Sequence, residues 1–173
     1  MPRLLLLRHA KAVAQSASGD IARELSKRGR RDAVRLGEFL RAQNIRPDAA
    51  LVSPSKRTRE TAELVLRELV GAPVVSFDAN LYNASAAALL RAIVRTAGET
   101  LLVVAHNPGI GELAFSLAIK ANAAAATKIG FPTCALAIFE SDSHGLAPFS
   151  GALRLTTWMT PETMSDDNHE MNN

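Results

Sequence analysis

Cysteine, tryptophan and tyrosine each occur only once in the 173 residues, and phenylalanine only 6 times. The single Cys134 cannot form an internal disulfide, and no spacing of cysteine with histidine matches a structural zinc site. The aromatic residues are too few to interleave with basic residues, as they do on many nucleic-acid-binding surfaces. These scarcities exclude a disulfide scaffold, argue against a zinc module, and favour a reducing compartment.

Long apolar runs and blocks of one charge are also absent. Residues 4–7 are all leucine, but Arg8 and His9 follow at once, so this run is neither a signal-peptide core nor a membrane span. The 20 basic and 17 acidic residues are scattered along the chain and leave a net charge of +3, which suits a small site for an anionic substrate. We therefore expect a cytoplasmic protein that binds neither nucleic acid nor a membrane.

The length and composition predict one domain. Because 47% of the 173 residues are apolar and 21% are charged, the chain can bury one core but is too short for two ordinary ones. This domain is expected over residues 1–161. Residues 162–173 are polar and without period, which predicts a flexible tail.

Short apolar runs alternate with stretches of helical period. The runs resemble strands buried on both faces of a parallel sheet, and they cover residues 4–7, 49–52, 74–77 and 101–105. Apolar residues at helical spacing follow each of them, after Ser26, near Val65, after Ser85 and from Ile110 onward. Parallel neighbours need a crossover, and a helix makes one compactly, so the alternation favours an α/β fold.

The C-terminal part has a different pattern. Two strand-like runs, 134–140 and 153–159, flank a turn-rich stretch around His144, which predicts a hairpin or edge pair. The expected fold is a three-layer α/β/α sandwich, in which a mostly parallel central sheet of about six strands carries this C-terminal pair.

Basic and imidazole side chains follow three of the expected strands. Arg8 and His9 come directly after the first strand, Arg57 just after the second, and His106 after the fourth. In open α/β sheets the ligand crevice lies at the carboxyl ends of the strands, so these four side chains are expected to form one cationic pocket. Each has a plainer interpretation by itself, as an exposed loop residue, a solvated helical turn or part of a turn.

Three motifs in this order resemble the signatures of the histidine phosphatase superfamily. Arg8-His9-Ala10 resembles its Arg-His-Gly motif with alanine in place of glycine, and residues 53–62 resemble Ser-Pro-x-x-Arg-(Ala/Thr)-x-(Gln/Glu)-Thr-Ala. His106-Asn107-Pro108-Gly109 resembles its third motif. Further matches around Arg23, at 131–133 and at Trp158-x-x-Pro161 are similar to the short SixA-type phosphohistidine phosphatases. The resemblance covers roughly residues 1 to 161.

The resemblance implies a metal-independent phosphatase without a cofactor, in which His9 takes up the phosphoryl group as a neutral imidazole. Nearby cations are expected to favour that neutral form by repelling a proton. Arg8, Arg57 and His106 would then hold the phosphoryl oxygens, where the transition state carries its charge.

Three more residues are expected to bind substrate by their positions in the motifs. Arg23 resembles a further substrate-binding arginine, with a surface salt bridge as the alternative. Asn107 and Gly109 belong to the third motif, and the backbone amides at the start of the following helix face an anion favourably.

Larger branches of the histidine phosphatase superfamily carry a Glu or Asp soon after the third strand, which protonates the leaving group. This general acid has no counterpart here. Asn83 stands at that position, and its amide cannot protonate a leaving alkoxide; Asp78 is the nearest carboxylate, with turn capping as the alternative. A phosphorylated histidine needs less help, because its distal ring nitrogen takes a proton near neutral pH and imidazole then leaves as a neutral amine. The favoured substrate is therefore phosphohistidine on a phosphotransfer protein, with inorganic phosphate as product. A small phosphorylated metabolite and a silent phosphate-binding protein are the alternatives.

Overall fold

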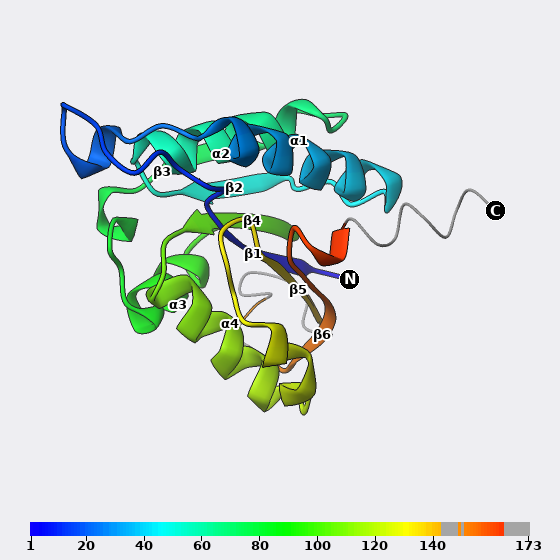
Figure 1. Ribbon diagram of the computed structural model, residues 1–173. Coiled ribbons are helices and arrows are strands. Elements are labelled where there is room, and N and C mark those ends of the chain that lie inside the picture. The colour runs from blue at the N-terminus through cyan, green and yellow to red at the C-terminus, as the bar shows by residue number, and fades with distance from the viewer. Residues whose placement is uncertain (143–148, 150, 165–173) are drawn as a thin grey trace.

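The computed structural model describes residues 1–142, 149 and 151–164, and its centre is a six-stranded sheet in the order β3-β2-β4-β1-β5-β6 (Figure 1). The strands are β1 (Arg3–Arg8), β2 (Ala49–Val52), β3 (Val74–Phe77), β4 (Thr100–Ala105), β5 (Leu136–Ser141) and β6 (Leu153–Met159). The first four pair in parallel, β5 pairs antiparallel with β1, and β6 pairs antiparallel with β5. The predicted mostly parallel sheet with a C-terminal strand pair is confirmed.

Helices cover both faces of the sheet. They are α1 (Lys27–Ala42), α2 (Lys56–Arg67), α3 (Ala86–Ile93) and α4 (Gly109–Lys120), with short 3-10 turns at Asp20–Ala22, Ala79–Leu81 and Ala124–Ile129. Ser26, Ser55 and Ser85 begin the first three helices, each accepting a hydrogen bond from the amide three residues on. α1 and α2 lie on one face and α3 and α4 on the other, as in the expected sandwich (Figure 1).

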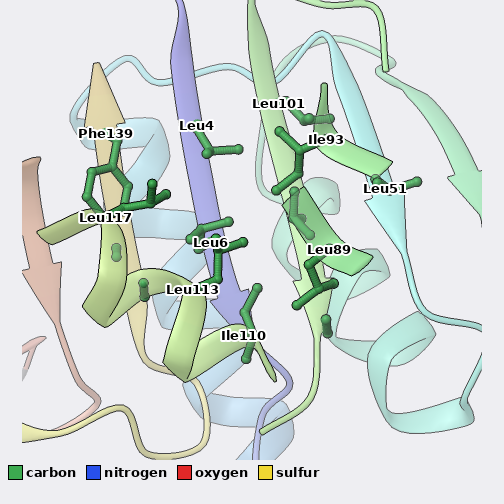
Figure 2. Packing of buried hydrophobic residues seen from close by; sticks show 14 of the residues in the cluster. Leu4, Leu6, Leu51, Leu89, Ile93, Leu101, Ile110, Leu113, Leu117 and Phe139 are labelled. Atoms are coloured by element: carbon green, nitrogen blue, oxygen red, sulfur yellow. The ribbon is translucent and has the colours of Figure 1, made fainter. Parts of the chain in front are cut away.

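The leucines of β1 divide between the two cores. Leu4 and Leu6 face α3 and α4 (Figure 2). Leu5 and Leu7 belong to the core under α1 and α2. All four are completely buried. Burying a leucine side chain contributes about 1.5–3 kcal/mol, so this continuous apolar run is what a strand covered on both faces requires.

The prediction that residues 74–77 form a strand buried on both faces is wrong. Among the described strands, β3 lies at the edge of the sheet and pairs with β2 alone, and Val74 and Phe77 are 72% and 50% exposed. Arg59 covers part of this edge, with its guanidinium carbon 4.2 Å from the centre of the Phe77 ring. A short apolar run indicates strand conformation but not the place of the strand in the sheet.

The strand order creates a crevice at one end of the sheet. β4 lies between β2 and β1, so the chain crosses back over the opposite face with α3 before it reaches β4. The neighbours β1 and β4 are therefore followed by helices on opposite faces, α1 and α4 (Figure 1). Their carboxyl ends form the switch point at which open α/β sheets bind ligands.

Two expectations concern residues that the structure does not describe in full. The turn around His144 and most of the 162–173 tail lie outside the described residues. Among the described residues, none of the helices has the length and apolar character needed to cross a bilayer.

Candidate active site

A polar cavity of about 320 Å³ lies at this switch point. The four side chains that the sequence placed at strand ends, Arg8, His9, Arg57 and His106, all line it. The other lining residues are Lys11, Ala12, Asp20, Arg23, Asn83, Asn107 and Thr133. Residues almost a hundred positions apart therefore meet in one site. The centres of the two histidine rings are 5.2 Å apart.

His9 is held as a neutral imidazole with a defined tautomer. Its Nδ1 lies 2.8 Å from the carbonyl oxygen of Ala10, which can only accept, so Nδ1 carries the proton and Nε2 has a free lone pair. Burial lowers the pKa of His9 to about 3 although the hydrogen bond to the Ala10 carbonyl raises it, and repulsion between a protonated His9 and His106, Arg57 and Arg8 also lowers it. Desolvation of the buried ring thus lowers the pKa of His9 more than the nearby cations do, although the sequence had suggested the cations as the cause.

His106 is also neutral, with the opposite tautomer. Its Nδ1 lies 3.3 Å from Nη2 of Arg57, which can only donate, so Nε2 carries the proton and donates to Ser53 Oγ at 2.7 Å. Burial and then the charge of Arg57 lower the pKa of His106 to about 4. In this state His106 accepts a hydrogen bond from Arg57, whereas the sequence led us to expect both side chains to hold the phosphoryl oxygens.

Arg57 projects from the first turn of α2 and is bound by Asp20. Its Nη1 donates to the Asp20 carbonyl oxygen at 2.7 Å and its Nη2 to Asp20 Oδ2 at 3.0 Å. The Tyr82 hydroxyl donates to the same Oδ2 at 2.5 Å. These bonds fix the guanidinium beside both histidines.

Two buried guanidinium nitrogens in the site have no hydrogen-bond partner among the described residues, Arg8 Nε and Arg57 Nε. A buried donor without an acceptor costs about 1–3 kcal/mol, so such groups are rare unless a ligand uses them. Both nitrogens belong to arginines that line the cavity beside a neutral histidine with a free lone pair, and two guanidinium groups there suit a tetrahedral oxyanion better than a neutral ligand.

The segment before β5 supports the other wall of the site. The carbonyl of Phe131 accepts from Arg8 Nη1 at 3.1 Å and from Asn107 Nδ2 at 3.0 Å. Trp158 holds this segment, because its indole donates to the Gly130 carbonyl at 3.1 Å and its ring packs on that of Phe131 at 5.1 Å. Trp158 and Phe131 therefore position Arg8 of the first motif and Asn107 of the third.

The three expected substrate-binding residues have different surroundings. Arg23 and Asn107 line the cavity, and Arg23 also donates to Asp20 Oδ1 at 2.9 Å. Gly109 is buried at the start of α4 and does not line the cavity; a Cβ there would lie 1.9 Å from the carbonyl oxygen of Ala84. The structure thus supplies a packing reason for this glycine.

Asn83, which the resemblance aligns with the acid of larger family members, lines the cavity. Asp78 does not line it; its carboxylate accepts from the backbone and side-chain nitrogens of Asn80, so it caps the turn, as in the alternative interpretation. Of the described residues that line the cavity, only Asp20 has a carboxylate. In the same part of the chain, no group of three histidine, cysteine, aspartate or glutamate side chains could hold a metal ion.

Sequence reasoning missed four residues of the site. Ser53 sets the tautomer of His106, and Thr61 Oγ1 accepts from the Ala10 amide at 3.0 Å; both lie within the second motif, which was the available signal. Asp20 and Tyr82 had no signal, because their partners lie far away in the sequence.

Comparisons with known proteins agree with this geometry. Residues 4–83 match the model of the histidine phosphatase superfamily (branch 1). An uncharacterized protein of Mycobacterium tuberculosis is 32% identical over 161 residues, which cover 90% of this chain and 99% of that protein.

Solved structures are similar over almost the whole chain. A structure described as a phosphohistidine phosphatase SixA, from Agrobacterium tumefaciens, has a TM-score of 0.79 and 26% identity, covering 92% of this chain and 98% of that one. The protein histidine phosphatase SixA in complex with tungstate has a TM-score of 0.73 and 22% identity, covering 94% and 99%. The chain therefore belongs to the histidine phosphatase superfamily, in its SixA-type branch, and is a phosphatase.

Proposed function

We propose that the protein hydrolyses phosphohistidine on a phosphotransfer protein, through a phosphoryl intermediate on His9. The observation that carries this proposal is the free Nε2 lone pair of His9 in a cavity lined by the guanidinium groups of Arg8 and Arg57. The structural likeness to SixA proteins supports the same substrate class.

In the first step His9 Nε2 attacks the phosphorus in line with the leaving nitrogen. A P–N bond forms to His9 while the substrate P–N bond breaks, and the leaving imidazole keeps the electron pair of the broken bond. Arg8 and Arg57 line the cavity, and their fixed positive charges stabilise the equatorial oxygens in the transition state. Water then attacks the phosphorus, His9 leaves, and inorganic phosphate is the product.

His106 changes its role when the substrate enters. A dianionic phosphoryl group beside it raises the pKa of its imidazole, so that Nδ1 gains a proton and becomes a donor. Ser53 keeps the ring in position throughout, because it already accepts from Nε2. His106 thereby joins the two arginines as a charged donor.

The exit side of the site favours a nitrogen leaving group. Asn83 cannot protonate an alkoxide, whereas a protonated phosphohistidine ring leaves as neutral imidazole. Residues 78–99 form the whole connection from β3 to β4, and α3 with the turn at Ala79–Leu81 occupies half of it. Little chain remains for a lid, which suits a side chain presented by another protein better than a small metabolite.

The first test is to trap the intermediate. Protein incubated with a radiolabelled phosphohistidine protein and quenched in alkali is expected to carry acid-labile, alkali-stable label on His9. His9→Gln is expected to lose the label and at least about 10³-fold in kcat, because the nucleophile is gone. Arg59→Gln is the control, since Arg59 contacts Phe77 outside the cavity and its loss leaves both readouts unchanged.

Substrate comparison decides between the proposed activity and the alternatives. The proposal requires a higher kcat/KM for phosphohistidine protein than for an alkyl phosphate. A preference for the alkyl phosphate would point to a small metabolite instead. Phosphate binding without turnover of either compound would point to a silent binding protein.

A further inference from the structure

Asp20 places a negative charge in a cavity that is proposed to bind a phosphoryl dianion. It is the one carboxylate among the described residues that line a cavity with four cationic side chains, and half of its side chain is exposed. A carboxylate a few ångströms from a phosphoryl dianion costs about 1 kcal/mol or more, depending on the local dielectric. Such a charge opposes binding of the phosphoryl group unless it interacts favourably with another part of the substrate.

The position of this carboxylate is built by three separate segments. Arg23 donates to Oδ1 at 2.9 Å, while Arg57 and Tyr82 donate to Oδ2 at 3.0 and 2.5 Å. Tyr82 also packs edge-on against His106, with ring centres 5.5 Å apart, so Asp20 is tied to the catalytic wall. Oδ1 accepts one of these bonds, and a carboxylate oxygen has two lone pairs.

The charge of Asp20 is maintained by the same contacts. The hydrogen bonds from Tyr82, Arg23 and Arg57 hold the pKa of Asp20 below its usual range, so the group is ionised at neutral pH. An ionised carboxylate can accept a hydrogen bond from an N–H group but cannot act as an acid toward an alkoxide.

We propose that Asp20 determines substrate specificity by accepting a hydrogen bond from the distal ring N–H of the phosphohistidine leaving group. This inference rests on the proposed function and names the residue that recognises the leaving imidazole. The carboxylate stabilises the protonated ring while the phosphoryl group is held by the arginines.

The proton count of the step is simple. The ring enters as a cation, with the phosphoryl group on one nitrogen and hydrogen on the other. As the P–N bond breaks, its electron pair stays on the ring, which leaves as neutral imidazole with the distal hydrogen still bonded. Asp20 remains ionised throughout, so no proton donor is consumed.

The same carboxylate disfavours phosphate esters. An alkyl or aryl ester has no N–H to donate to Asp20, so it gains no hydrogen bond that offsets the repulsion between this carboxylate and its phosphoryl dianion. Asp20 therefore increases discrimination between the two substrate classes in two ways, because it attracts the ring N–H of phosphohistidine and repels the dianion of an ester.

The test compares Asp20→Asn with the wild type on phosphoimidazole and on phenyl phosphate. For phosphoimidazole we expect kcat/KM to fall about ten- to a hundred-fold, because a charge-assisted hydrogen bond is lost. For phenyl phosphate we expect no loss and at most a small gain. The basic limb of the pH profile for phosphoimidazole is expected to move down by about one pH unit, because the ring loses its proton more readily.

Glu24→Gln is the matched control. Glu24 lies in the same segment, pairs with Lys56 at 2.9 Å and does not line the cavity. Glu24→Gln therefore removes one negative charge, and we expect the ratio of kcat/KM for phosphoimidazole to kcat/KM for phenyl phosphate to stay unchanged. Tyr82→Phe removes one donor to Asp20 while keeping the ring, and a smaller change in the same ratio is expected. Thermal melting of each variant checks that the fold is intact.

Equal losses on both substrates in Asp20→Asn would overturn the inference, because Asp20 would then only hold Arg57 in place. Wild-type protein that fails to turn over phosphoimidazole and phosphohistidine protein would instead contradict the proposed function. The two failures are thus distinguishable in the same set of assays.

Discussion

Single hydrogen bonds determine the chemistry of both histidines. The Ala10 carbonyl leaves a free lone pair on Nε2 of His9, as the proposed attack requires, while Arg57 and Ser53 give His106 the opposite tautomer. The partners Ala10, Ser53 and Arg57 all belong to the motifs, but a motif does not show which of its atoms bond to each ring. Burial of both rings then keeps them neutral, and this has a measurable cost for stability in acid.

Stability is expected to fall as the pH drops below about 6.5. The pKa values of His9 and His106 are about 3 and 4 in the folded protein, so below pH 6.5 the unfolded chain binds protons that the folded chain does not. Each ring then lowers the free energy of unfolding by up to about 1.4 kcal/mol per pH unit. Urea unfolding at pH 5 to 6.5 measures this slope above the range in which carboxylates titrate.

The His9→Gln and His106→Gln variants serve as controls for this slope. Each removes one titrating ring, so each is expected to reduce the pH dependence by about half. A slope that neither variant changes would show that other groups cause it.

Among the elements, α4 depends on a close approach of two main-chain segments. The turn after β4 brings the first residue of the helix against the carbonyl of Ala84, which precedes α3. The same turn places His106 and Asn107 in the cavity. Packing of Gly109 and geometry of the site are therefore coupled through one helix start.

Gly109→Ala is expected to destabilise the protein by about 2–3 kcal/mol and to lower activity. The new Cβ would meet the Ala84 carbonyl at 1.9 Å, and a backbone atom cannot move aside as a flexible side chain can. Chemical denaturation measures the loss. Glu112→Ala, on the exposed side of the same helix, is the control, and an equal loss in both variants would contradict this account.

Across the whole molecule, the site joins three strand ends and two loops. His9, Arg57 and His106 follow β1, β2 and β4, while Asp20 and Tyr82 come from the connections after β1 and β3. An oxyanion bound there contacts segments that separate on unfolding. Binding is therefore expected to stabilise the entire fold.

Inorganic phosphate is expected to raise the melting temperature of the wild type. At a hundred times its Kd, the added stability is about 2.7 kcal/mol. Arg57→Gln should lose most of this shift because it removes a clamp residue. Arg59→Gln should keep it, since that side chain lies over Phe77; loss of the shift in Arg59→Gln alone would place the anion elsewhere.

Much of the fold could be predicted from local patterns. The run 4–7 and the caps at Ser26 and Ser85 identify elements through backbone and burial preferences that act over a few residues. The edge position of Val74–Phe77 could not be predicted, because sheet order depends on pairing between distant strands. The same reason hid Asp20 and Tyr82, whose functional contact crosses 62 positions.

By itself, the sequence determined which elements form and which basic and imidazole groups stand at their ends, because both depend on neighbouring residues. Only the tertiary structure decided that β4 lies between β1 and β2, and hence that His106 faces His9 across a switch point. It also decided that a carboxylate enters a cationic cavity. The physical reason is that strand order and loop contacts are set by long-range packing, which no local pattern encodes.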